Sequence, residues 1–188
     1  MKARILKMLN IPGILIIAML MMTIQSTFFT SYPLSFFQPD GVLLLLIWIS
    51  MKRNFTEGGI MALLLGYSME LHSASPKGLY LTEAMFIFLL THFMYRNFQV
   101  LNKRTLMVIG AGLSVLSRIA VLFILFILNK AENEWQYTLR LLAPTALVHA
   151  LLIPFVFQFL HRFDIWTLKN PNAEHQHEQD FYLDEEFI

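Results

Sequence analysis

Long hydrophobic runs separated by short polar gaps dominate this 188-residue chain. Polarity within the runs does not alternate at the two-residue period of barrel strands. A helix needs about 20 mostly apolar residues to cross the hydrocarbon core of a bilayer. We therefore predict an all-α integral membrane protein with six transmembrane helices, at residues 12–29, 41–51, 59–71, 79–95, 106–128 and 141–163.

Two of these segments, 41–51 and 59–71, are short for a complete crossing. A hairpin that enters the membrane without fully crossing it is therefore the alternative for this pair. Pro12 is expected in the first turn of its helix, where a missing N–H costs nothing. Pro154 is expected to kink the last helix, because proline removes a backbone donor and clashes with the preceding turn.

Positive charge is distributed unevenly between the gaps. Of the 14 Lys and Arg residues, ten fall in one alternating set of gaps, three fall in the other, and Arg118 lies inside segment 106–128. Cytoplasmic loops of membrane proteins carry the excess of these residues. Both chain ends are therefore predicted to lie in the cytoplasm.

Composition and charge agree with a membrane domain followed by a short tail. Charged residues make up 14% of the chain, whereas about a quarter is usual in soluble domains. There is no cysteine, which excludes disulfides and thiolate metal sites. We expect a membrane domain over 1–169. Residues 170–188 carry six acids and no Lys or Arg, so we expect a disordered cytoplasmic tail, or alternatively a segment that docks on a basic partner.

Arg118 is the most costly residue in the predicted membrane region. An intramembrane charge is a functional hypothesis by default, because lipid solvates it poorly. Glu70 and Glu83 are the candidate counter-charges. The alternative is that backbone carbonyls and water satisfy the guanidinium.

Other residues indicate packing rather than chemistry. Gly59, Ala62 and Gly66 share one face of a helix, and small faces let helix backbones approach closely. His149 is expected to form a hydrogen bond between helices and not to bind a metal. The chain lacks a Gly-x-Ser-x-Gly motif and a phosphate-binding glycine loop. We therefore expect no enzyme activity, cofactor or metal.

Several short motifs occur in a recognisable order. They are Gln25 in the first segment, Pro39-Asp40 before an apolar run, Gly66 to Glu70, the turn Ser75-Pro76-Lys77-Gly78-Leu79-Tyr80, and Ala146 to His149 followed by Pro154. In this order they resemble the rod shape-determining protein MreD family. Glu70 stands where that family usually has Asp, Lys77 stands where an apolar residue is common, and the acidic tail is foreign to the family.

The same motifs have a physical interpretation. Pro39 sets the chain into a helix, and Asp40 in its first turn is favoured by the helix dipole. Pro76 and Gly78 indicate a tight outer turn, with Glu70 just below it. The residues expected to bind a partner or to hold the structure are Pro39, Asp40, Gly59, Gly66, Glu70, Ser75, Pro76, Gly78, Tyr80, Arg118 and Pro154.

The resemblance implies a non-enzymatic scaffold of the bacterial cell-elongation machinery, located in the inner (cytoplasmic) membrane. It implies binding to MreC and association with MreB, RodA and a class-B penicillin-binding protein. Lipid is the expected surrounding, nucleic acid is not an expected partner, and a homo-oligomer is left open. It also implies the six-helix fold of energy-coupling-factor S-components.

That fold suggests an alternative function, the substrate-binding subunit of a vitamin or other small-molecule transporter. Such subunits usually carry an Ala-x-x-x-Ala patch in the first helix, whereas this chain has only Ala18 there. A general membrane adaptor unrelated to wall synthesis is the third interpretation.

Overall fold

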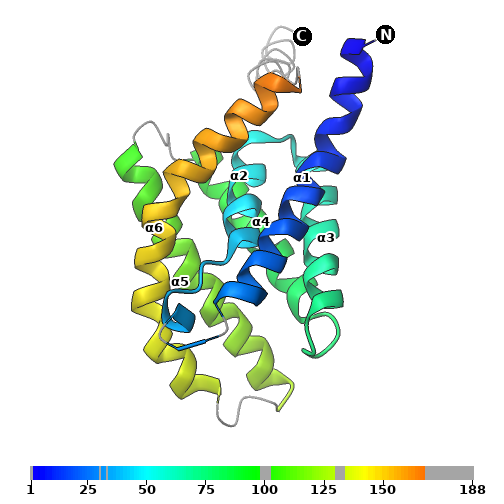
Figure 1. The fold of residues 1–188 in the computed structure, drawn as a ribbon. Helices are drawn as coiled ribbons and strands as arrows, with labels where there is room; N and C mark the ends of the chain where they lie inside the picture. The colour runs from blue at the N-terminus through cyan, green and yellow to red at the C-terminus, as the bar shows by residue number, and fades with distance from the viewer. Residues whose placement is uncertain (1, 30, 33, 98–102, 130–133, 168–188) are drawn as a thin grey trace, which may run out of the picture.

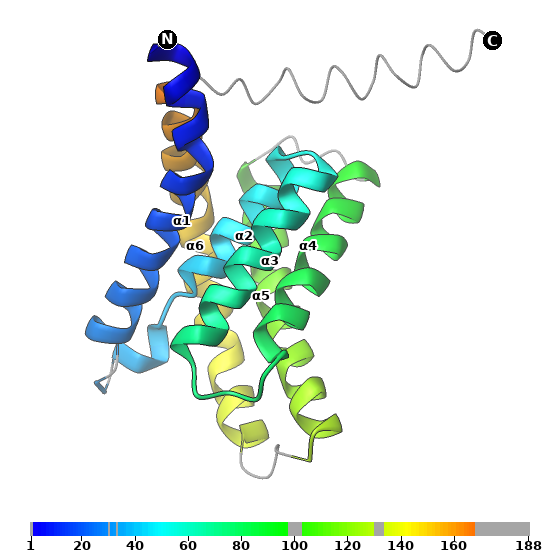
Figure 2. The same ribbon diagram turned by 90° about the vertical axis from the view of Figure 1, so that its right-hand side faces the viewer.

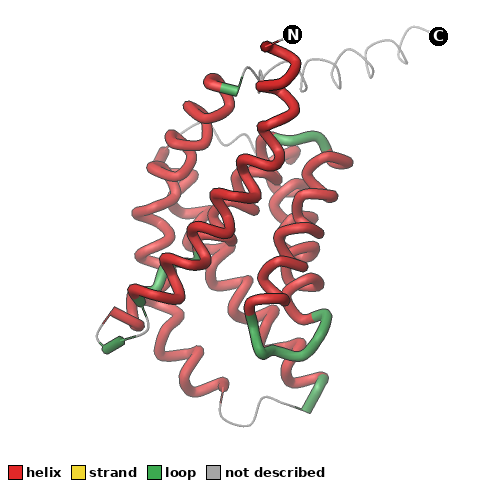
Figure 3. The backbone as a smooth tube through the Cα atoms, turned by 45° about the vertical axis from the view of Figure 1, so that its right-hand side comes forward, coloured by secondary structure: helices red, strands yellow, loops and turns green. Residues whose placement is uncertain are grey.

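The computed structural model of this protein describes residues 2–29, 31–32, 34–97, 103–129 and 134–167, and over these ranges it is helical, without strands (Figure 3). The elements are α1 (Lys2–Phe28), the 3-10 helix η1 (Leu34–Phe37), α2 (Gly41–Lys52), α3 (Phe55–His72), α4 (Leu79–Asn97), α5 (Lys103–Ile127) and α6 (Glu134–Trp166). Each of the six predicted segments corresponds to one α-helix, so the all-α class is confirmed. The predicted tail at 170–188 lies outside the described residues.

The short helix α2 forms the centre of the bundle. The other five α-helices all contact it, and its residues 42–51 are all buried. Its sequence agrees with this position, because a helix that is apolar on every side is either buried in protein or surrounded by lipid. Twelve residues span about 18 Å, so α2 begins in the middle of the bundle, as Figure 1 shows.

The described ends of the chain meet at one end of the bundle, which we call the terminal end. The start of α1, the end of α6 and the α2–α3 connection all lie there, and the α3–α4 connection lies at the opposite end (Figures 1 and 2). Helix α1 begins at Lys2, ten residues before the expected start. The prediction that Pro12 occupies the first turn is therefore wrong. The polar segment before it is also helical, which places Pro12 inside the helix.

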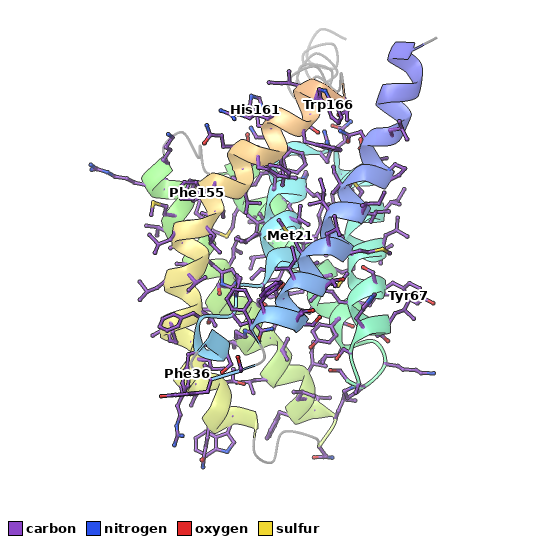
Figure 4. The ribbon with its side chains drawn as sticks, in the orientation of Figure 1. Met21, Phe36, Tyr67, Phe155, His161 and Trp166 are labelled. Atoms are coloured by element: carbon purple, nitrogen blue, oxygen red, sulfur yellow. The ribbon has the colours of Figure 1, made fainter. Side chains whose placement is uncertain are left out.

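Three helices are long and apolar enough to cross a membrane, over Leu9–Phe28, Lys103–Ile127 and Thr138–Trp166. Large apolar side chains on several helices point away from the bundle, as Tyr67 of α3 does in Figure 4. Phe123 of α5 and Phe155 of α6 are 63% and 69% exposed. Lipid is the natural surrounding for such faces, and these features indicate a membrane protein.

Helix α6 contains two prolines and curves along its length (Figure 1). Pro144 and Pro154 each leave a carbonyl one turn earlier without its usual donor. The Thr145 hydroxyl donates to the Leu141 carbonyl at 2.6 Å, which adds a local bond beside the first proline. The kink expected at Pro154 itself stays a prediction.

The predicted small face of α3 packs against α4. A Cβ atom at Gly66 would lie 2.9 Å from both Ala84 Cβ and Leu81 Cα. Contacts this short require the two helices to move apart, so glycine is needed at this position. At Gly59 the nearest atom would lie 3.6 Å away, on Phe88. The close approach is therefore concentrated at Gly66.

Replacing Gly66 by alanine is expected to lower the free energy of unfolding by about 1–3 kcal/mol, because the added methyl group overpacks the α3–α4 contact. Gly112 in α5 is the matched control, since a Cβ there meets no atom within 4 Å. Its alanine variant should be neutral or more stable, because glycine is a poor helix former. Unfolding in mixed detergent micelles measures both. Equal effects of the two substitutions would contradict the close packing.

Candidate functional site

The start of α2 is held in the middle of the bundle by Asp40. Its backbone is extended, with φ −90° and ψ 92°, and its Oδ1 accepts a hydrogen bond from the Leu43 N–H at 3.0 Å. Asp40 is thus the N-cap residue just before the helix, not a residue of its first turn as predicted. The cap satisfies one of the free N–H groups at the start of the helix, and the dipole favours an acidic residue at this end.

His149 of α6 joins the start of α2 to two further helices. The Asp40 N–H donates to His149 Nε2 at 2.8 Å, so this nitrogen is unprotonated. The ring proton must then lie on Nδ1, 2.7 Å from the Thr145 carbonyl oxygen and 2.8 Å from Ser114 Oγ of α5. This neutral ring therefore connects α2, α5 and α6. The expected hydrogen bonding between helices is confirmed for His149.

The neighbouring Ser114 and His149 are not arranged as a nucleophile and its base. A base must offer an unprotonated nitrogen to the hydroxyl. Nδ1 carries the proton, and Nε2 is occupied by the Asp40 N–H. The geometry thus assigns both residues a structural role. Within the described ranges, no group of three or more His, Asp or Glu could hold a metal ion.

A hydrogen bond to the Glu70 carboxylate stabilises the predicted turn between α3 and α4. The Gly78 N–H donates to Glu70 Oε1 at 2.5 Å, and Gly78 has a φ of +89°, a conformation that suits glycine. The hydroxyls of Ser73 and Ser75 lie 2.7 Å apart in the same loop. The carboxylate therefore links the end of α3 to the residue just before α4.

Arg118 forms neither of the ion pairs predicted for it. Glu70 is bonded to Gly78, and Glu83 accepts a hydrogen bond from the Ser117 hydroxyl. Within the described part of the chain, the ion pairs closer than 4.0 Å are at Arg53. The prediction failed because a hydroxyl next to Arg118, and not Arg118 itself, points at Glu83.

Arg118 instead lines a cavity of about 480 Å³ at the end of the bundle opposite the terminal end. The cavity lies between the α3–α4 loop and helices α4, α5 and α6. Four hydroxyl-bearing residues also line it, namely Ser73, Ser75, Tyr80 and Thr138. Four residues predicted to be functional thus surround one space: Ser75, Pro76, Tyr80 and Arg118. Pro39, Asp40, Gly59, Gly66 and Pro154 do not line it.

A second polar cluster, at the terminal end, was not anticipated from the sequence. Arg53 Nη2 lies 2.6 Å from Asp164 Oδ1 and 2.9 Å from Asn10 Oδ1. Asn10 Nδ2 also donates to Asp164 Oδ1 at 2.9 Å and to Thr167 Oγ1 at 2.6 Å. Arg53, Asp164 and Asn10 are fully buried. This Arg53 cluster ties α1, the α2–α3 connection and the end of α6 together.

Single polar residues in apolar surroundings were the signal for this cluster. Asn10 precedes the apolar run of α1, and Asp164 stands between Phe163 and Ile165. From the sequence alone, Arg53 is equally well explained as an ordinary charged residue of a basic loop. Only the fold brings the three residues together, since more than 100 positions separate Arg53 from Asp164.

Comparison of the chain with protein-family models, with curated proteins and with solved structures finds no match. The function must therefore be inferred from the residues and their geometry.

Proposed function

We propose that this protein is a non-enzymatic scaffold of the bacterial cell-elongation machinery, as its resemblance to the MreD family implies. It would cross the inner membrane six times, with both ends in the cytoplasm. Its helix faces would hold the single membrane span of MreC and thereby help to position peptidoglycan synthesis. MreB, RodA and a class-B penicillin-binding protein would complete the assembly.

The observation that carries the proposal is that the residues behind the resemblance contact one another. Gln25 Oε1 accepts a hydrogen bond from the Gly41 N–H at 3.3 Å, next to the Asp40–His149 bond. Glu70 is bonded to Gly78. Motifs from the first, second and last predicted helices therefore meet in the folded chain, and the Glu70–Gly78 bond joins two further motifs at the α3–α4 turn. Chance similarities scattered along a sequence would have no reason to do so.

The distribution of polar groups favours a binding role. The polar side chains of these motifs are engaged inside the bundle, at α2 and at the α3–α4 loop. The outward faces of the helices offer large apolar side chains instead, such as Ile16 of α1, Phe123 of α5 and Phe155 of α6. These faces are open to lipid, and the span of a partner would be held on one of them by van der Waals packing.

The test is capture of partners from bacterial membranes by the intact, tagged chain. MreC should be recovered with it. A chain lacking residues 170–188 should recover MreC equally well, because the proposed contact lies among the membrane helices. Failure of the intact chain to recover any elongation-machinery component would contradict the proposal.

Photo-crosslinking identifies the helix face involved. A photoreactive residue is placed in turn at Ile16, Phe123 and Phe155, which lie on different helices and are 58%, 63% and 69% exposed. A docked span should crosslink strongly from one of these helices and weakly from the others. Equal yields from all three would indicate contact by random collision in the membrane and would contradict a specific scaffold.

A further inference from the structure

Arg118 is a charged residue inside a membrane helix, and no described carboxylate lies within 4.0 Å of it. Among the described residues, no hydrogen-bond or ion-pair partner is in contact with its guanidinium. It lies nine residues before the end of α5 at Ile127, which corresponds to a depth of about 14 Å. A charge at such a depth is costly unless something compensates it.

The cavity beside Arg118 is shaped for a ligand that is part polar and part apolar. Its volume of about 480 Å³ falls within the range of small-molecule sites. Arg118 is the only charged residue among its described lining residues, and hydroxyl-bearing residues accompany it. Leu79, Val121 and Leu125 provide an apolar side.

The nearby acids Glu70 and Glu83 form no direct ion pair with this cation. Glu70 and Glu83 do not line the cavity, and each is already bonded to another residue, Glu70 to Gly78 and Glu83 to Ser117. Guanidinium groups bind phosphate and carboxylate groups through two parallel hydrogen bonds. Hydroxyl groups can donate to the remaining oxygens of such an anion.

We propose that this cavity binds a phosphate-type anion through Arg118, with the apolar part of the same molecule against α4 and α5. The chemistry fits the phosphate of an anionic membrane lipid and also a free phosphate compound. The apolar residues Leu79, Val121 and Leu125 on one side of the cavity favour a lipid. The site is independent of the scaffold function, because it does not involve the outward helix faces.

The experiment uses the full-length protein in a phosphorus-free detergent, after removal of native lipid. Native mass spectrometry compares binding of phosphatidylglycerol with binding of phosphatidylcholine of the same chain length. The protein should retain phosphatidylglycerol preferentially. Arg118→Gln should weaken this binding about tenfold, the usual scale for loss of a charge-assisted hydrogen bond. Arg118→Lys should keep part of it, because lysine retains the charge but not the two parallel hydrogen bonds.

Lys77→Gln and Arg140→Gln are the matched controls, because they remove one exposed positive charge on residues next to lining residues Pro76 and Leu141. Each should change binding less than twofold. If Arg118→Gln fails to fold, Val121→Trp fills the cavity with Arg118 intact and should reduce binding. Phe123→Trp, on the exposed side of α5, should not.

Thermal unfolding separates a ligand site from a structural role. Without lipid, Arg118→Gln should melt at the same temperature as the original chain or higher, and phosphatidylglycerol should stabilise the original chain only. Displacement of the lipid by millimolar inorganic phosphate would identify a free phosphate compound as sufficient, and resistance would identify a lipid. Unchanged binding by Arg118→Gln, or equal binding of the two lipids, would overturn the proposal.

Discussion

Replacing Asp164 by alanine is expected to lower the free energy of unfolding by about 3–5 kcal/mol, the largest effect we anticipate for a single substitution. The carboxylate of Asp164 contacts both Arg53 and Asn10, and these side chains are fully buried. Its removal leaves the Arg53 guanidinium buried without its principal counter-charge. Glu57 cannot replace it, because its Oε1 lies 3.7 Å from Arg53 Nε, on another part of the group.

The double substitution Arg53→Met with Asp164→Leu should recover most of this loss. A buried ion pair can often be replaced by apolar residues of similar size at little cost, whereas removal of one partner is strongly destabilising. The two single variants and the double variant form a double-mutant cycle. Its coupling energy measures the interaction directly.

Unfolding of the purified protein in mixed micelles of mild detergent and sodium dodecyl sulfate provides the measurement. Arg162→Ala is the control, because Arg162 is an exposed charged residue on the same turn of α6. It should change the stability by less than about 0.5 kcal/mol. If Asp164→Ala were no more destabilising than Arg162→Ala, the Arg53 cluster would not hold the terminal end together.

The helices could be predicted because their apolar runs are long and uninterrupted. Segment 41–51, although too short for a normal crossing, was predicted as a helix from its uninterrupted apolar run and forms α2. Its position at the centre of the bundle was not predicted. Gly66 could be predicted from spacing alone, because small residues three and four apart share a helix face. The local sequence pattern was sufficient to predict features that depend on neighbouring residues, such as a helix or a small helix face.

Predictions failed where the cause was a long-range contact. Arg118 was expected to pair with Glu70 or Glu83, but Glu70 is occupied by Gly78 and Glu83 by Ser117, one position away from Arg118. A single residue changes the direction on a helix by about 100°, so the choice between Ser117 and Arg118 depends on how α5 is rotated. Arg53 was counted only as evidence for topology, although it is fully buried beside Asp164. Residues 98–102 and 130–133, like the tail, lie outside the described ranges.

Replacing His149 by leucine is expected to lower the free energy of unfolding by about 2–4 kcal/mol. Leucine has similar size but cannot accept the Asp40 N–H, nor can it bond Ser114. The buried Ser114 hydroxyl and the half-buried Asp40 N–H then lose their partner. Loss of a partner costs about 1–3 kcal/mol for a buried group and less for a half-buried one. The start of α2 should loosen, so amide hydrogen exchange should increase around Gly41.

His149→Gln is the conservative variant. The side-chain oxygen of glutamine lies at about the same reach as Nε2 and can accept the Asp40 N–H, so this variant should retain a substantial part of the stability. His161→Leu is the matched control, because His161 is an exposed histidine on the same helix. It should be nearly neutral. If all three variants unfolded alike, the bond between Asp40 and His149 would contribute little, and another interaction would have to hold α2 in the middle of the bundle.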